Sequence, residues 1–193
     1  LMRLKNTKVS PAQFIPIAEE TGQIIKIDRI LTEKVVRQMA EWREHGIPLY
    51  KVSINYSYSQ VSDVHYVDFL EELLKRYNIP PELICIEITE SLFISNKEAV
   101  SKLLNEFVKR GISLALDDFG TGYSSLSYLT FLPINVVKID KSLVDNYLSN
   151  EKGDFIKNIV RLVHSLAMKL TVEGVEHQWQ NEKLKTFHCD YIQ

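Results

Sequence analysis

The chain repeatedly alternates short apolar strand patterns with amphipathic helical patterns, and this alternation limits the folds that it can adopt. Strand patterns lie at residues 50–55, 83–88, 112–116, 135–139 and 170–172, helical patterns separate most of them, and Tyr191 begins a sixth strand. Such alternation is typical of parallel βαβ units. Because six strands follow in a row with no dinucleotide-type glycine fingerprint after the first, we predict a TIM-like (β/α)8 barrel rather than an open sheet.

The predicted barrel is incomplete in this chain. A complete barrel takes about 250 residues, and the chain has 193. We therefore expect residues 1–193 to be most of one domain, with the first strands and the final segment missing. In the first helix, Ser10 and Gln13 are the expected capping box. Asp28 is the expected cap of the second helix.

Composition narrows the class of protein. Lys and Arg total 23 and Asp and Glu total 25, so the net charge is −2, which argues against binding polymeric nucleic acid. The two cysteines, Cys85 and Cys189, have no CxxC spacing, so we expect reduced thiols. No apolar run approaches a membrane span of about 20 residues, and no signal peptide is visible. We expect a cytoplasmic domain, or one at the cytoplasmic face of the inner membrane if the parent chain has membrane segments.

Each of the first five predicted strands ends in polar or charged residues. In chain order these are Asn55, then Glu87 and Glu90, then Asp117 and Asp118, then Lys138 and Asp140, then Glu173 and Glu176. In a parallel barrel these ends converge on one mouth, where active sites lie. Clustered carboxylates repel one another unless cations neutralise them, and a set that offers only oxygen ligands suits Mg²⁺ or Mn²⁺.

Lys138 is the one predicted cation among these carboxylates. It could hold an attacking water or a phosphoryl oxygen, or it could form an ordinary ion pair with Asp118 or Glu173, and both can be true. Oxygen-ligated metals beside a cationic side chain favour phosphoryl-ester chemistry. In such sites two metals about 3.5 to 4 Å apart activate a water and stabilise the leaving oxygen.

The segment 117–126, DDFGTGYSSL, is the most distinctive motif. Together with residues 10–22, 53–57, 86–91, 132–140 and 172–176, in this order, it resembles the EAL-domain family over essentially the whole chain. The resemblance implies a TIM-like barrel with one irregular strand. It also implies Mg²⁺- or Mn²⁺-dependent hydrolysis of cyclic di-GMP to linear 5'-pGpG, with two ions, which lowers this second messenger in bacterial signalling.

The same resemblance implies roles for individual residues. The metal ligands would be Asn55, Glu87, Asp117 and Asp118. Lys138 would position the water and Glu173 would assist the metal or the water, which leaves open whether Glu173 or the metal activates it. Glu90 and Glu176 would stabilise loops, Glu90 the one at residues 119–125, which in the family also contributes to dimerisation.

The resemblance further implies contacts at both ends of the chain. Arg3 would bind a substrate phosphate and Gln193 would line the substrate pocket. We expect a homodimer, with diguanylate-cyclase-type or sensor domains in the same parent chain. Leu1-x-Arg3 fits the end of the Glu-Ala-Leu motif, which puts the metal-binding Glu two positions before Leu1. Without that carboxylate we expect the fragment to lose metal affinity and turnover.

Two alternatives to an enzyme remain open from the sequence. One is a catalytically inactive module that binds cyclic di-GMP and passes on a signal. A residue without a carboxylate two positions before Leu1 would favour this alternative. The other is a scaffold that acts by protein contact alone, through helix faces such as residues 97–110.

Overall fold

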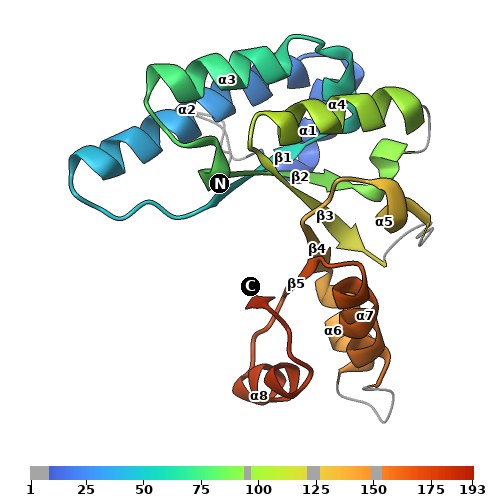
Figure 1. Ribbon diagram of the computed structural model, residues 1–193. Coiled ribbons are helices and arrows are strands. Elements are labelled where there is room, and N and C mark those ends of the chain that lie inside the picture. Colours follow the sequence, from blue (N-terminus) through green and yellow to red (C-terminus); the bar gives the residue numbers. More distant parts are fainter. Residues whose placement is uncertain (1–8, 94–96, 121–126, 149–153) are drawn as a thin grey trace. The chain divides into compact units, whose positions relative to one another are not determined.

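The computed structural model describes residues 9–93, 97–120, 127–148 and 154–193 (Figure 1). The chain divides into two compact units. Unit 1 comprises residues 1–50 and 57–81, and unit 2 comprises residues 51–56 and 82–193. Unit 2 contains every strand of the described residues and every described residue of the predicted site.

Unit 2 is built on a parallel sheet of six strands. The strands are β1 (Val52–Tyr56), β2 (Ile84–Thr89), β3 (Ser113–Phe119), β4 (Val136–Ile139), β5 (Lys169–Val172) and β6 (Tyr191–Ile192). They pair in sequence order, β1 to β6, and every pairing is parallel. Doubly wound open sheets reverse their strand order, whereas barrels keep it. The predicted α/β fold with an incomplete TIM-like barrel is thus confirmed.

The strands form the core of unit 2 because their apolar residues face both sides of the sheet. Strands of parallel sheets are covered on both faces and therefore read as near-continuous apolar runs. The sheet residues with 2% or less of their surface exposed include Ile84, Ile86, Ile88, Leu114, Leu116, Val137, Ile139, Leu170 and Val172. The polar side chains that interrupt these runs lie toward the carboxyl ends of the strands.

Helices of unit 2 follow the strands along the chain. They are η3 (Glu90–Phe93), α4 (Lys97–Lys109), α5 (Ser127–Phe131), α6 (Lys141–Tyr147), α7 (Asp154–Ser165) and α8 (Gln178–Thr186). Helices α5 and α6, which span five and seven residues, were not predicted from the sequence. Segments this short do not show helical periodicity.

Unit 1 contains α1 (Pro11–Glu20), α2 (Ile24–Glu44), the short helix η1 (Tyr58–Ser62) and α3 (Tyr66–Arg76). A buried hydrogen bond of 2.8 Å joins Thr32 Oγ1 and the Tyr66 hydroxyl. Arg29 donates two hydrogen bonds of 2.7 Å to the carboxylate of Asp63, the fork geometry in which guanidinium binds carboxylate best. These contacts tie α2 to the segment that leads into α3. The short helix η2 (Pro81–Leu83) follows at the junction of the two units.

The capping predictions in unit 1 have different outcomes. At α1 the capping box is confirmed, because the Ser10 backbone N–H donates to Gln13 Oε1 at 3.0 Å. At α2 the prediction was wrong: the helix begins at Ile24, with Gln23 in the cap position, so Asp28 lies inside it. The physical reason is the sharp turn at Gly22, whose φ of +68° lets α2 begin soon after α1 ends. None of the described helices is both long and apolar enough to cross a membrane.

Candidate functional site

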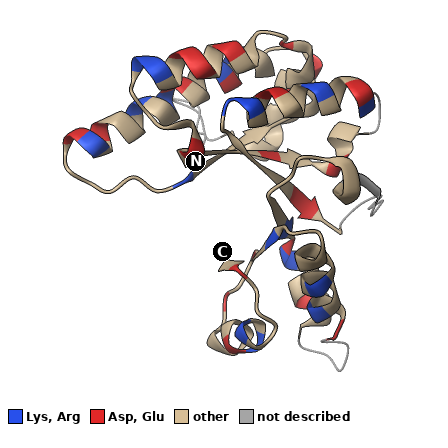
Figure 2. Cartoon of the chain, viewed as in Figure 1, with Lys and Arg blue, Asp and Glu red and all other residues tan. Residues whose placement is uncertain are grey.

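The carboxyl ends of β1, β2 and β3 lie at the same level of the sheet. Asn55 on β1 is in register with Glu87 on β2, and Thr89, the last residue of β2, is in register with Asp117 on β3. Figure 2 shows acidic residues at the arrowhead end of β3. The predicted site residues on these strands are therefore neighbours across the sheet, as the convergence of parallel strand ends requires.

A backbone irregularity in β3 brings two consecutive carboxylates to one place. In a regular strand, side chains of neighbouring residues point to opposite faces. The β3–β4 register shifts between Leu116 and Phe119, and Asp118 has φ +55°, in the left-handed region. As a result, Asp117, Asp118 and Glu173 each offer a carboxylate oxygen within 4.8 Å of the other two. A non-glycine residue held in such a conformation is typical of functional sites.

Lys138 on β4 lies at the centre of the carboxylates. Its Nζ is 2.6 Å from Glu173 Oε1, 2.9 Å from Glu87 Oε1 and 3.1 Å from Asp117 Oδ1. Only 6% of the Lys138 side chain is exposed, against 11%, 15% and 21% for Glu87, Asp117 and Glu173. One buried ammonium thus bridges carboxylates from β2, β3 and the end of β5. We call Lys138, Glu87, Asp117, Asp118 and Glu173 the strand-end cluster.

The electrostatics of the cluster follow from these contacts. Burial alone would lower the pKa of Lys138, but hydrogen bonds to Glu173 and Glu87 and the charge of Asp117 outweigh it, and the pKa is raised. The ammonium is therefore fully charged at neutral pH. The pKa of Asp118 is also raised, first by burial and then by the nearby charge of Asp117. A bound cation would stabilise the ionised form of Asp118 against this burial and repulsion.

The strand-end cluster has the donor set of a hard cation. Asp117, Asp118 and Glu173 offer only carboxylate oxygens, which Mg²⁺ and Mn²⁺ prefer, and no histidine or cysteine belongs to this group. The remaining predicted ligands are Asn55 and Glu87, which are paired across β1 and β2. Asn55 is exposed, and Glu87 contacts Lys138, which also contacts Asp117 and Glu173. The residues present therefore fit a divalent metal.

The loop residues singled out by the sequence also have defined contacts. Glu90 Oε1 accepts a hydrogen bond of 3.4 Å from the backbone N–H of Gly120, at the start of the loop that Glu90 was expected to hold. Residues 121–125 of that loop lie outside the described residues. Glu176 accepts a hydrogen bond from the ammonium of Lys141, for which no role was predicted from the sequence.

Three further residues at strand ends or chain ends were predicted from the sequence: Gln193, Arg3 and Asp140. Gln193 lies at the end of β6 and donates its backbone N–H to Val172 O at 2.9 Å. Arg3 lies outside the described residues. Asp140, a strand-end carboxylate, caps α6 by accepting from the Ser142 backbone N–H at 2.8 Å. Hydrogen bonds from the Ser142 side chain and from this backbone N–H lower the pKa of Asp140. Its capping role was missed, although an Asp before a helix start is a common N-cap.

The fold and the cluster together define a class: an α/β protein of the TIM-barrel type with an acidic, lysine-centred site at the carboxyl ends of its strands. The protein-family model of the EAL domain matches residues 1–193. The chain belongs to the EAL domain family.

Two curated relatives and one solved structure illustrate the similarity. The chain is 37% identical over 184 residues to "Signaling protein YkoW" of Bacillus subtilis, covering 95% of this chain and 23% of that protein. It is 34% identical over 187 residues to "Bifunctional diguanylate cyclase/cyclic di-GMP phosphodiesterase MucR" of Pseudomonas aeruginosa, covering 96% and 27%. The chain thus spans about a quarter of the length of these relatives.

The solved structure described as "PaMucR Phosphodiesterase, c-di-GMP complex" superimposes with a TM-score of 0.85 at 32% sequence identity. The match covers 96% of this chain and 81% of that one. Because identity exceeds 30% over nearly the whole chain, the likeness extends beyond the general barrel to the family.

Proposed function

We propose that this chain is the phosphodiesterase domain that hydrolyses cyclic di-GMP to linear 5'-pGpG. The observation that carries the proposal is the strand-end cluster, in which one buried lysine bridges three carboxylates. Two of these, Asp117 and Glu173, also belong to the group that could hold a divalent metal. The names of the relatives support the choice of substrate, because MucR is a cyclic di-GMP phosphodiesterase and its structure is a complex with that nucleotide.

The cofactor we propose is Mg²⁺ or Mn²⁺, as two ions. The residues that would hold them are Asn55, Glu87, Asp117 and Asp118, with Glu173 assisting. The carboxylate oxygens of Asp117, Asp118 and Glu173 lie within 4.8 Å of one another, which supports this set. When bound, such ions polarise phosphoryl oxygens and make a water more acidic. The left-handed backbone at Asp118 supports its role, because it directs this carboxylate to the same place as that of Asp117.

Protein groups would orient the reactants. The Lys138 ammonium donates hydrogen bonds, so it can hold the attacking water or a non-bridging phosphoryl oxygen. Glu173, 2.6 Å from Lys138 Nζ, is placed to accept a proton from that water. Arg3 and Gln193 would bind the substrate outside the metal group, Arg3 through a phosphate.

The reaction balances with water as the only co-reactant. The water oxygen forms a bond to one phosphorus, and the bond from that phosphorus to the ribose 3' oxygen breaks. One proton of the water passes, by way of Glu173 in this proposal, to the departing 3' oxygen. The product is a linear dinucleotide with a 5'-phosphate and a free 3'-hydroxyl.

The setting of the domain is part of the proposal. We infer that residues 1–193 are most of one EAL-type domain, which acts in the cytoplasm as a homodimer. Diguanylate-cyclase-type or sensor domains in the same parent chain would supply its input. The length of the relatives, about four times that of this chain, supports such additional domains.

The test uses the full-length protein with cyclic di-GMP and Mn²⁺ or Mg²⁺, in water enriched in ¹⁸O. We expect conversion to pGpG with one ¹⁸O in the 5'-phosphate. We expect no conversion when EDTA removes the metal, and no cleavage of cyclic di-GMP by the Asp117→Asn variant. Calorimetry of the same samples measures binding of the nucleotide. Tight binding with an unchanged nucleotide in the presence of metal would refute hydrolysis and establish the sensor alternative.

A further inference from the structure

The loop that follows β5 carries Glu173 and is held by backbone hydrogen bonds to β4 and to Gln193, the residue after β6. The Glu173 N–H donates to Ile139 O at 3.0 Å, and the Val175 N–H donates to Gln193 O at 3.2 Å. These bonds fix the path of the chain through Glu173 toward the neighbouring β4 and β6. They do not by themselves determine where the loop goes beyond Val175.

A buried glutamine holds the far end of the same loop. Gln180 on α8 is 5% exposed, and its Oε1 accepts from the backbone N–H groups of Glu176 and His177, both at 2.8 Å. The backbone from Glu173 to His177 is therefore anchored at both ends, and Gly174 lies between the anchors.

Gly174 is covered by the side chain of Lys141, the first residue of α6. Gly174 has φ +69°, and a Cβ added to it would lie 2.5 Å from Lys141 Cβ and 2.7 Å from Lys141 Cδ. Real Cβ atoms do not approach other atoms so closely. Position 174 therefore needs glycine for two reasons: its backbone has a positive φ, and the aliphatic part of Lys141 occupies the place of a Cβ. Beyond Gly174, the Lys141 ammonium donates to Glu176 Oε1. We call Lys141, Gly174 and Glu176 the Lys141 clasp.

The Lys141 clasp repeats, farther out, the pairing inside the strand-end cluster. Lys138 pairs with Glu173, and three residues later in each segment Lys141 pairs with Glu176. The inner pair is largely buried, with 6% and 21% of the side chains exposed, whereas the outer pair has 44% and 62% exposed. Two lysine–glutamate pairs thus connect the end of β4 with the loop after β5.

We infer that Lys141 is a positioning residue, which holds the loop so that Glu173 stays directed at Lys138 and the Asp117–Asp118 pair. This inference rests on the proposed phosphodiesterase function. An exposed ion pair contributes little to folding. A displacement of about 1 Å at a reacting group, in contrast, can cost roughly 100-fold in rate. The clasp therefore acts on turnover more than on stability.

The experiment compares Lys141→Ala, Lys141→Arg and Lys109→Ala in the full-length protein. Lys109 pairs with Glu106 on α4, so its variant removes an exposed lysine–glutamate pair far from the clasp in sequence. We expect Lys141→Ala to lower kcat for cyclic di-GMP roughly tenfold with KM nearly unchanged. Lys141→Arg, which keeps the cation and the aliphatic stem, should restore most of kcat, and Lys109→Ala should behave as wild type.

Hydrogen exchange of the metal-free protein gives a second readout that does not need turnover. We expect Lys141→Ala to speed amide exchange in the peptide spanning residues 173–177, with Lys109→Ala leaving it unchanged. Wild-type kcat in Lys141→Ala, or unchanged exchange in that peptide even with a lower kcat, would overturn the inference. If wild-type protein does not cleave cyclic di-GMP, the proposed function fails, and the exchange measurement alone still decides whether the clasp holds the loop.

Discussion

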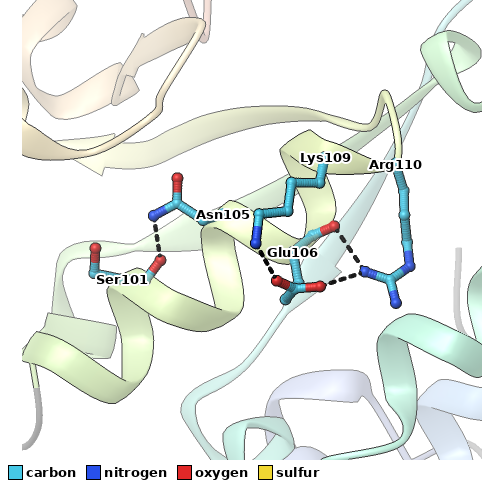
Figure 3. A network of polar contacts seen from close by, with 5 residues as sticks. All are labelled: Ser101, Asn105, Glu106, Lys109 and Arg110. Carbon is cyan, nitrogen blue, oxygen red and sulfur yellow. Dashed lines mark hydrogen bonds and ion pairs between the residues drawn. The ribbon is translucent and has the colours of Figure 1, made fainter.

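Two charge networks in unit 2 contain similar groups but differ in burial. On the surface of α4, Glu106 accepts from Lys109 Nζ at 2.8 Å and from Arg110 Nη1 at 2.7 Å, with Asn105 bonding to the helix backbone nearby (Figure 3). Glu106 is 43% exposed and Lys109 is 70% exposed. In the strand-end cluster the central Lys138 is 6% exposed.

The difference shows which network is structural support and which is a candidate site. Surface pairs between neighbouring helical turns contribute little and are weakened by salt. Hydrogen bonds from Lys109 and Arg110 lower the pKa of Glu106, as expected for an acid with two cations beside it. The strand-end cluster instead has one cation for several carboxylates. Folding does not require such an excess of buried negative charge, whereas metal binding does.

Replacing Lys138, the central cation of the strand-end cluster, should have the largest effect on activity and stability. We expect Lys138→Met to lower kcat by roughly 1,000-fold, because it removes a preorganised donor. In metal-free protein it should also destabilise the fold by about 3 kcal/mol, since the carboxylates lose their shared partner. Steady-state kinetics and urea unfolding measure the two effects. Lys109→Met is the matched control, and a kcat within tenfold of wild type in Lys138→Met would contradict the role of Lys138.

Removing one carboxylate of the metal group should have the next largest effect. We expect Asp117→Asn to weaken Mn²⁺ binding by about 100-fold, because the neutral amide keeps the shape but not the charge of the ligand. Calorimetry of Mn²⁺ binding without nucleotide is the measurement. Asp154→Asn, at an exposed position on α7, should bind as wild type does. Equal affinity in the Asp117 and Asp154 variants would place the metal elsewhere.

A half-buried carboxylate in unit 1 extends the comparison of buried and exposed charges, because its neighbour is another acid. Asp28 Oδ2 is buried and has no hydrogen-bond partner among the described residues. Burial, with a smaller contribution from the charge of Glu19, raises the pKa of Asp28 from 3.8 to about 6. The folded state therefore binds this proton more tightly than the unfolded state. Its stabilising contribution is complete below about pH 4 and is lost as the pH rises through 6.

The variant that tests this sign is Asp28→Asn, which imitates the protonated acid. We expect it to stabilise unit 1 by about 2 kcal/mol at pH 7 and to change little at pH 4. Urea unfolding followed by hydrogen exchange of α2 peptides measures the change. Glu33→Gln, exposed on the same helix, should show no such pH dependence. Destabilisation at pH 7 in Asp28→Asn would show that Asp28 has a stabilising partner.

The exposed network should give the smallest effect. We expect Glu106→Gln to leave kcat unchanged and to shift the melting temperature only slightly, because both cations stay hydrated when the carboxylate is removed. Thermal unfolding at low and high salt checks this expectation. A large loss of activity in this variant would show that burial is a poor guide to function in this domain.

Much of the fold and the location of the site could be predicted from sequence. The apolar strands and the polar residues that end them are local patterns, and parallel pairing brings the strand ends together. The left-handed backbone at Asp118 could not be predicted, because two consecutive aspartates carry no signature of a register shift.

The detailed pairing also lay beyond the sequence. For Lys138 the pattern left Asp118 or Glu173 as partner, and the structure shows contacts to Glu173 and to Glu87 and Asp117, which only the strand register brings within reach. The Lys141 clasp depends on the approach of a side chain to Gly174. Lys141 and Gly174 lie far apart in the sequence, so no local pattern predicts that approach.

The most direct test of the account is the location of bound Mn²⁺ by anomalous X-ray scattering, in crystals of the full-length protein grown with the metal. We expect anomalous peaks in direct contact with carboxylate oxygens of Asp117 and Asp118, at about 2.0 to 2.3 Å. Ordered crystals with Mn²⁺ bound only at sites away from these two residues would contradict it.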